Sequence, residues 1–398
     1  MFKFFKLIFI FTISLLIFPN NKIIVFGDRR GFRFADNSRY LFLLLANKSN
    51  FRCIWLSKNK DILKYLKNKN FECYESDSWI GKYYSLRAKW HIFNHSSRDT
   101  SENLSIFRNK LNLWHGTPVK IPKKFKKNDF SVQFLHKIKN YFIKDYLLLS
   151  DDKFSNHVLE HFPKKKYKTV IANLPRNIIL KKNYKKLNYF RTAYEKEIVK
   201  KINSSNKKVI GYFPTFRENS KDIFIDFKKD KEFTNLNNFL KKNNSIILFK
   251  KHQNSFREDK SVSYNYKNDV INFKLSKLSN FITLEYECDL NSILSKCDLL
   301  ITDYSGVVFD FLFLENPIIF YCPDIKKYKI KPGTALNIEK QDFAYFAKDK
   351  FQLYKLLNQY FKNKKKFKEF HKLKRRKMLN YIFPKKNFLK DIKKILKN

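Results

Sequence analysis

Residues 299–321 read LLITDYSGVVFDFLFLENPIIFY, and this stretch contains the pattern that determines the fold. Two short apolar runs, 299–302 and 317–321, enclose a segment that is apolar enough to form a buried helix. Short apolar runs that alternate with helical segments are typical of βα units, in which parallel strands are buried on both faces. The turn at 303–306 is therefore predicted at the carboxyl end of a buried strand, the edge where ligands bind in open α/β sheets.

The same alternation runs through the rest of the chain in two series. The predicted strands are 23–28, 51–57, 71–76, 91–96, 111–114, 146–150, 169–175, 208–214, 245–252, 281–286, 299–303 and 317–323. The predicted helices are 37–48, 61–70, 79–90, 153–162, 234–243, 290–298 and 305–316. This pattern predicts an α/β chain of two Rossmann-like domains, whose parallel sheets face a central cleft in a GT-B-like arrangement.

A chain of 398 residues is too long for one ordinary hydrophobic core and suits two domains. We predict an apolar membrane-associating segment at 1–21 and an N-terminal Rossmann-like domain at 22–180. A polar, lysine-rich connecting segment follows at 181–208. A C-terminal Rossmann-like domain is predicted at 209–345, followed by basic C-terminal helices at 346–398.

Two segments carry membrane-like patterns. Residues 2–18 read FKFFKLIFIFTISLLIF, whose apolar run is shorter than the roughly 20 residues that span a bilayer. The PNN sequence at 19–21 does not resemble a signal cleavage site, so we expect an uncleaved helix in the membrane interface. At 362–377, KNKKKFKEFHKLKRRK interleaves cations with Phe and Leu, which suits an anionic bilayer surface. The alternative is a solvated helix that packs on the sheet through its Phe and Leu face.

The chain is strongly basic, with 83 Lys and Arg against 36 Asp and Glu, a net charge of +47. Such a charge attracts polyanions: nucleic acid, an anionic membrane or a phosphate-rich substrate. The lysines are spread along the whole sequence, and a biased base composition explains them equally well. Because no recognisable nucleic-acid-binding module appears, we expect no nucleic-acid partner.

The cysteine and glycine patterns exclude several kinds of site. The five cysteines are scattered without a CxxC pair, which argues against a zinc site or a disulfide framework. Neither GxGxxG nor a P-loop occurs among the seven glycines. We therefore expect no structural zinc site, no Rossmann-type dinucleotide site and no P-loop, and we expect phosphate to bind at a helix N-terminus.

Two groups of chemistry-bearing residues follow predicted strands closely. The amides of Ser305 and Gly306 open a helix and can bind a diphosphate, although simple capping of that helix by Asp303 or Ser305 is the alternative. His115 lies in the sequence WHGTP at another strand end. Its imidazole can take a proton from an alcohol at neutral pH, or it can serve a structural purpose only.

Three further groups also lie at predicted strand ends. Lys250 and His252 are two residues apart, so they share one face of a strand and can both donate to phosphate. Pro214-Thr215 precedes Arg217 in YFPTFR, and Arg176 follows a strand in NLPRN. Because strand ends line the cleft of a two-domain α/β protein, we expect all these residues to form one site.

Together these motifs resemble the CDP-glycerol glycerophosphotransferase family, whose members include teichoic acid primases and polymerases. The family patterns WHGTPxK, PTFR, KxH, TDYSSxxFDF and KPIxFY match 114–120, 214–217, 250–252, 302–311 and 316–321. The resemblance covers 22–330. The chain departs from the family pattern at Gly306, Gln253 and Ile178, where the family has Ser, Pro and Asp, and these departures leave the polyol open.

The resemblance implies a GT-B fold with an acceptor-side N-terminal domain, a C-terminal domain that binds the CDP donor, and no metal or cofactor beyond the substrate CDP-glycerol. It implies that His115 and His252 are catalytic, with His115 as base on the acceptor hydroxyl unless the two roles are exchanged. It assigns donor and phosphate binding to Gly116, Thr117, Arg176, Pro214, Thr215, Arg217, Lys250, Asp303, Ser305, Gly306 and Asp310. The acceptor hydroxyl would attack the β-phosphorus and expel CMP, which requires mainly positioning and charge stabilisation.

The implied function is transfer of glycerol phosphate to a teichoic-acid-like or capsular polymer, or to its lipid-linked precursor. The implied partners are a CDP-activated polyol, a polyol-phosphate or glycan acceptor and an anionic membrane, at the cytoplasmic face of the plasma membrane. Three alternatives remain. They are a CDP-ribitol- or nucleotide-sugar-dependent envelope transferase, a basic nucleic-acid-binding protein and a non-catalytic envelope scaffold.

Overall fold

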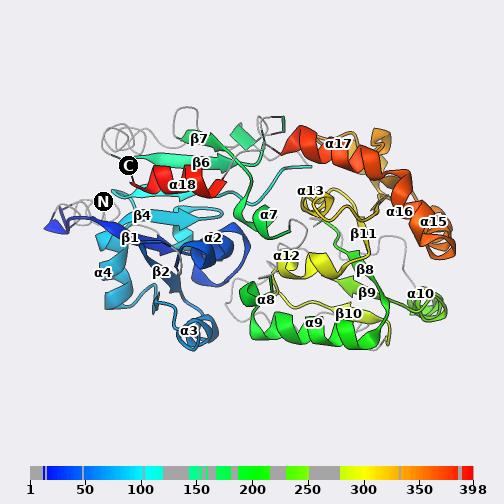
Figure 1. Cartoon of the computed structure of the whole chain (residues 1–398), viewed down its shortest axis with the longest axis horizontal. Coiled ribbons are helices and arrows are strands. Elements are labelled where there is room, and N and C mark those ends of the chain that lie inside the picture. The colour runs from blue at the N-terminus through cyan, green and yellow to red at the C-terminus, as the bar shows by residue number, and fades with distance from the viewer. Residues whose placement is uncertain are drawn as a thin grey trace. The chain divides into compact units, whose positions relative to one another are not determined.

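The chain folds into two units, each built around a parallel β-sheet, in this computed structural model (Figure 1). Unit 1 comprises 1–117, 124–179 and 383–398, and unit 2 comprises 118–123 and 180–382. The structure describes residues 12–13, 16–46, 49–101, 104–119, 143–151, 153–154, 158–159, 167–180, 187–215, 230–250, 278–330, 333–383 and 388–397. The α/β class with two parallel sheets is confirmed, because every described strand pairs in parallel.

The sheet of unit 1 has the order β3-β2-β1-β4-β5-β6-β7. Its strands are β1 (Asn20–Phe26), β2 (Arg52–Ser57), β3 (Cys73–Glu75), β4 (Ala88–Phe93), β5 (Asn109–Asn112), β6 (Asp145–Leu149) and β7 (Lys168–Ile171). The helices of unit 1 are η1 (Arg29–Gly31), α2 (Asp36–Ala46), α3 (Lys60–Lys67), α4 (Trp79–Arg87), η2 (Ser97–Asp99), α7 (Pro175–Leu180) and α18 (Phe388–Lys397). Because the order reverses between β1 and β4, the loops after these two strands meet at the switch point of the sheet.

The sheet of unit 2 repeats this order as β10-β9-β8-β11-β12-β13. Its strands are β8 (Lys208–Tyr212), β9 (Ser245–Phe249), β10 (Phe281–Thr283), β11 (Leu299–Thr302), β12 (Ile318–Tyr321) and β13 (Tyr345–Ala347). Its helices are α8 (Leu187–Phe190), α9 (Ala193–Ser205), α10 (Asp230–Lys242), α12 (Leu290–Ile293), η5 (Leu294–Lys296), α13 (Val307–Leu312), α14 (Ile325–Ile330), η6 (Ile338–Lys340), α15 (Lys350–Lys362), α16 (Lys364–Phe370) and α17 (Lys372–Ile382). The switch point of this unit lies between β8 and β11.

The helix predicted at 79–90 ends earlier than expected. Ser78 caps α4 by accepting a hydrogen bond from the amide of Gly81, and the helix ends at Arg87. Ala88 and Trp90 pair instead with Asn20 and Ile24 of β1, and both side chains are buried. Burial of this segment in the sheet therefore outweighs the helical pattern of the sequence.

The segment predicted as a connection at 181–208 contains α9, which belongs to unit 2. Thr192 and Glu195 form a capping box at its start, and the second carboxylate oxygen of Glu195 accepts the amide of Asp289 at 2.9 Å. Ile198 and Ile202 are buried on the inner face of the helix. An amphipathic helix with a good cap is thus part of the second unit rather than a linker.

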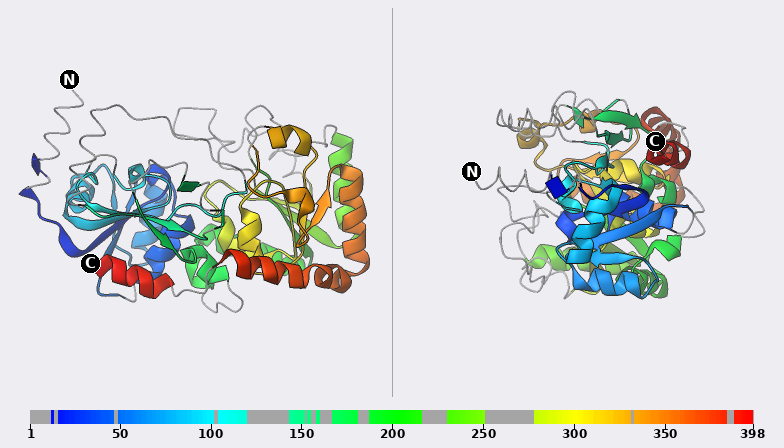
Figure 2. Two further views of the ribbon diagram at one scale, coloured as in Figure 1. Left: turned by 90° about the horizontal axis from the view of Figure 1, so that it is seen from above. Right: turned by 90° about the vertical axis from the view of Figure 1, so that its left-hand side faces the viewer.

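The basic tail divides between the two units. Leu353, Leu357 and Phe367 of α15 and α16 are buried in the core of unit 2, whereas Phe370 and Leu373 are exposed, so only Phe367 of the 362–377 segment packs as the packed-helix alternative expects. Helix α18 returns to unit 1, where Trp90 donates its indole N–H to the carbonyl of Leu396 at 3.1 Å, and Figure 2 shows α18 beside that sheet. Within the described ranges, no helix is both long and apolar enough to cross a bilayer.

Unfolding of unit 1 should depend on pH through His91 in the middle of β4. The side chain is fully buried, and burial lowers its pKa to about 3. In the unfolded chain His91 takes up a proton near pH 6.5, whereas in the folded chain it does so only near pH 3. The contribution of His91 to the free energy of unfolding is therefore complete above about pH 6.5 and is lost as the pH falls toward 3. We expect a loss of about 1.4 kcal/mol per pH unit in this window.

Urea unfolding at pH 7 and pH 5 measures this effect, because all four tryptophans of the chain lie in unit 1 and report on it. The variant His91→Gln should lose stability at pH 7 but should depend less on pH than the wild type. Equal pH dependence in the two proteins would contradict the assignment.

Candidate functional site

The loops after β1, β4 and β5 meet the N-terminus of α2 at one edge of the unit 1 sheet. Asn94 follows β4, accepts the amide of Ser38 at 3.0 Å and donates to Asp28 at 2.9 Å. Asn37 donates to the carbonyl of Trp114 at 2.9 Å. Buried side-chain amides therefore fix three strand-end loops against one helix.

His115 lies at the exposed tip of the loop after β5. Trp114 has a left-handed backbone (φ 53°), and its amide bonds to the side chain of Asn112 at 2.9 Å, which turns the chain sharply out of the strand. The ring of Trp114 is buried and lies 4.1 Å from that of His115, measured between centroids. The imidazole that we predict as a base is thus accessible to solvent, and the buried ring of Trp114 packs against it.

Arg176, at the start of α7, fixes this loop from a second side. One guanidinium nitrogen, Nη1, donates to the carbonyl of His115 at 3.0 Å and to the carboxylate of Asp36 at 2.8 Å. The backbone amide of Arg176 donates to Asn37 at 3.2 Å. The sequence prediction that Arg176 neutralises a diphosphate stays a prediction; the geometry gives it a positioning contact with the loop.

This arrangement of the loop requires glycine at position 116. Its backbone φ is +125°, and a Cβ at this position would lie 2.2 Å from Nη2 of Arg176. Thr117, the next residue, is buried and hydrogen-bonds Ser150 at 2.6 Å and Asp151 at 3.2 Å. The HGT sequence is therefore held at every position by contacts within unit 1.

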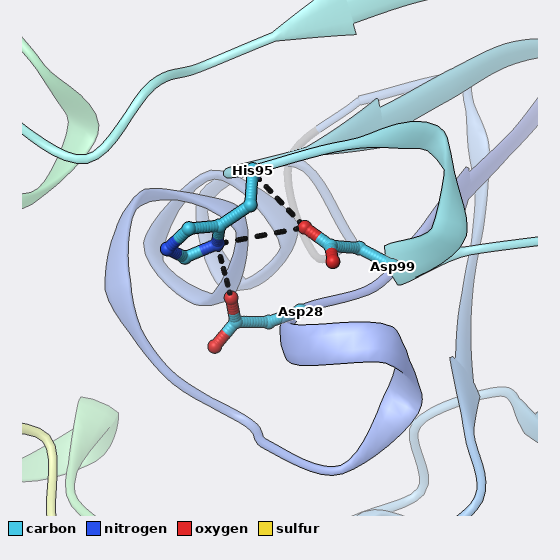
Figure 3. A group of neighbouring side chains, drawn as sticks. All are labelled: Asp28, His95 and Asp99. Atoms are coloured by element: carbon cyan, nitrogen blue, oxygen red, sulfur yellow. Dashed lines mark hydrogen bonds and ion pairs between the residues drawn. The ribbon is translucent and has the colours of Figure 1, made fainter. Parts of the chain in front are cut away.

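The sequence prediction missed a group of three residues, Asp28, His95 and Asp99, that lies next to the His115 ring. The rings of His95 and His115 are stacked, with centroids 4.9 Å apart and planes within 11°. Nδ1 of His95 lies 3.5 Å from Asp28 and 3.6 Å from Asp99, and Figure 3 shows both carboxylates converging on this nitrogen. Asp28 ends the predicted strand 23–28, and His95 lies near the end of the predicted strand 91–96, so the same strand-end criterion could have found both.

In unit 2, the loops after β8 and β11 are joined through Asp303. Its Oδ1 accepts the amides of Thr215 at 2.8 Å and of Tyr304 at 2.6 Å, and the carboxylate is buried. A second hydrogen bond joins the same two strand ends, because the hydroxyl of Thr302 donates to the carbonyl of Phe213 at 2.8 Å. The structure thus brings Pro214, Thr215 and Asp303 together at the switch point of this sheet, as the sequence predicted for strand ends.

The turn at Ser305 and Gly306 is half-buried and leads into α13, of which Gly306 is the N-cap residue. The hydroxyl oxygen of Ser305 accepts the amide of Val307 at 3.4 Å, and the N-cap residue Gly306 makes no side-chain capping bond. Asp310 is buried within α13. Tyr304 stacks on Tyr328 and donates to Asp324 at 2.9 Å, and burial with the nearby Asp324 carboxylate raises its pKa above the ordinary value.

Lys250 follows β9, which lies between β10 and β8 in the sheet, and its side chain is buried. The ammonium group donates to the carbonyls of Glu285 and Tyr286, after β10. This contact fixes the loop after β10, whereas a contact of Lys250 with phosphate stays a prediction. His252 and Arg217 lie outside the described residues.

The comparisons with known proteins agree with these motifs. The model of the CDP-glycerol:poly(glycerophosphate) glycerophosphotransferase family matches residues 9–382. The teichoic acid poly(glycerol phosphate) polymerase of Bacillus spizizenii is 27% identical over 80% of this chain and 78% of its own length. The teichoic acid ribitol-phosphate polymerase TarK of Staphylococcus aureus is 30% identical over 35% of this chain and 26% of its own length.

Among solved structures, one of the wall teichoic acid polymerase TagF is similar to this chain with a TM-score of 0.67. The alignment covers 95% of this chain and 88% of that one at 24% identity. At this identity, the likeness shows a shared fold, a GT-B-like α/β fold with two parallel sheets.

Proposed function

The chain belongs to the CDP-glycerol:poly(glycerophosphate) glycerophosphotransferase family, and on this premise we propose that it transfers glycerol phosphate from CDP-glycerol to a hydroxyl of a cell-envelope polymer and releases CMP. The observation that carries the proposal is the exposed imidazole of His115, held on a rigid loop by Arg176 and Asn37. A teichoic-acid-like or capsular chain, or its lipid-linked precursor, is the acceptor.

His115 is the base in this mechanism. The acceptor oxygen forms a bond to the β-phosphorus of the donor, the bond from that phosphorus to the oxygen of CMP breaks, and the acceptor proton passes to His115. Orienting the ring supports this step, because proton transfer needs the base within hydrogen-bonding reach of the hydroxyl. His252 and Arg217, which the family motifs place with the donor, complete the proposed charge stabilisation.

The donor is held by unit 2 through the turns at Thr215 and 303–306. The backbone amides of Ser305 and Gly306 and the cationic groups of the family motifs neutralise the diphosphate, so we propose that no metal ion takes part. Addition of a chelator should leave the rate of CMP release unchanged.

The test is CMP release from a panel of activated donors with a polyol-phosphate acceptor. CDP-glycerol should be consumed faster than CDP-ribitol and nucleotide sugars. CDP-ribitol is the second candidate, because a ribitol-phosphate polymerase is among the relatives. Turnover of a nucleotide sugar, with no CMP from either CDP-polyol, would refute the proposal.

We also propose that the protein works at the cytoplasmic face of the plasma membrane, bound to anionic lipid. Trp79, Ile80 and Tyr83 project from α4 of unit 1, and Trp79 is 87% exposed. The ammonium of Lys82 lies 5.3 Å from the Trp79 ring. Exposed aromatic side chains beside a cation are typical of helices that lie at an anionic interface, and the net charge of +47 favours the same partner.

The double variant Trp79→Ser/Ile80→Ser should therefore bind phosphatidylglycerol vesicles several-fold more weakly in a sedimentation assay. Deletion of residues 1–18 should weaken binding too, with less effect on turnover of a soluble acceptor. The control Tyr189→Ser removes an exposed aromatic side chain from unit 2 and should bind as the wild type. Equal sedimentation of all four proteins would contradict a bilayer contact through α4.

A further inference from the structure

The loop that carries His95 is tightly constrained at both ends. Asp99 accepts the amides of Arg30 at 3.0 Å and of His95 at 2.9 Å. Gly27 allows this loop to approach β1, because a Cβ there would lie 2.0 Å from the carbonyl oxygen of Asp99. The backbone of the loop that carries His95 is thus fixed by contacts with Asp99 and by its close approach to β1.

The surroundings of His95 favour a positively charged ring. Asp28 and Asp99 are almost fully buried, and Oδ2 of Asp28 has no hydrogen-bond partner among the described residues. Two buried carboxylates need a compensating cation, and both converge on Nδ1 of His95. Burial and the nearby Arg29 oppose protonation, but the two carboxylates outweigh them and raise the pKa of His95.

We propose that His95 is a positioning residue for His115: clamped by Asp28 and Asp99, it provides a cationic ring on which the imidazole of His115 is stacked and kept in its neutral, proton-accepting form. This inference rests on the proposed role of His115 as base. The supporting geometry is the nearly parallel stack with centroids 4.9 Å apart.

The physical reason is repulsion between like charges. The charged or titratable groups described around His95 are Asp28 and Arg29 after β1, Asp99 in η2, and His115 after β5. If His95 carries a proton, a second proton on His115 would place two positive rings face to face, which is unfavourable. The stack therefore disfavours a proton on His115 before the reaction, and the proton from the acceptor is carried only transiently as the reaction proceeds.

The pH profile of CMP release tests this role. His95→Phe keeps a flat ring under His115 but removes the charge, so the acidic limb of the kcat profile should move to higher pH by at least half a unit. The single variant leaves two buried carboxylates without a cation, so the double variant His95→Phe/Asp28→Asn, which removes one of them, guards against misfolding. In the double variant the acidic limb should move in the same direction as in His95→Phe, but by less. Arg98→Gln removes a positive charge from the same loop at an exposed position, and it should leave the limb unchanged.

An NMR titration of protein with ¹³C-labelled histidine provides a readout that does not need activity. The ring signals of His95 and His115, assigned from the variants His95→Phe and His115→Ala, should titrate in sequence. His95 should stay protonated to higher pH than His115, and His115 should titrate at higher pH once His95 is phenylalanine.

The possible outcomes distinguish the base role of His115 from the positioning role of His95. Full turnover in His115→Ala refutes the base role, and the inference with it. Loss of turnover in His115→Ala, combined with unchanged pH profiles and titrations in both His95 variants, refutes the inference alone. Inactivation by a chelator that Zn²⁺ reverses, together with a metal-induced shift of the His95 signals, would also overturn it, because the group would then bind a metal rather than a proton.

Discussion

Replacing His115 by alanine should lower the rate of CMP release by about 10²- to 10⁴-fold, the range expected for loss of a general base. The ring is at the exposed tip of its loop and contributes little to the core, so the fold of unit 1 should survive. Binding of CDP should be largely retained, because most of the predicted donor contacts lie in unit 2. A rate assay at saturating donor and calorimetric titration with CDP measure the two effects.

His371→Ala is the matched control. This histidine lies between α16 and α17, where it bonds the carbonyl of Asp342, and it belongs to no predicted site. Its loss should leave both turnover and CDP binding near wild-type values. If His115→Ala also keeps wild-type turnover, another group must accept the proton, and His252 would be the next residue to test.

The strand pattern could be predicted because both sheets are buried on both faces. The apolar runs at 299–302 and 317–321 became β11 and β12, and the residues at strand ends came to the carboxyl edges of the sheets. Such runs have few alternatives to forming a buried strand, since an apolar segment of this length must be buried. The sequence therefore predicts Thr215 and Asp303 at one edge, and the direct bond between them confirms that proximity.

The contacts around the loop that presents His115 could not be predicted in the same way, although the strand-end criterion could have found Asp28 and His95 singly. Asp28, His95 and Asp99 come together because β1 and β4 are neighbours, and the alternation of apolar runs does not give the order of strands. Similarly, Arg176 reaches Asp36 across 140 residues of sequence. Each contact joins single polar residues from separate segments, and a single polar residue has no periodicity that would reveal its partner.

The substitution Gly116→Ala should strain the loop that carries His115 and displace the Arg176 guanidinium. The new Cβ would lie 2.2 Å from Nη2 of Arg176, far inside any allowed contact, and the backbone φ of +125° is unfavourable for alanine. Strain of this kind costs about 1–3 kcal/mol, and the guanidinium must also move away from the His115 carbonyl. Both the stability of unit 1 and the rate of CMP release should fall.

A double-mutant cycle with Arg176→Ala distinguishes the clash from the backbone strain, because removal of the guanidinium leaves space for the methyl group. Urea unfolding followed by tryptophan fluorescence reports on unit 1 alone, since Trp55, Trp79, Trp90 and Trp114 all lie there. Gly116→Ala should destabilise the wild type more than it destabilises the Arg176→Ala variant, and the difference measures the contact. Equal losses in the two backgrounds would mean that Arg176 does not occupy the space above Gly116, and the loop that presents His115 would then need another support.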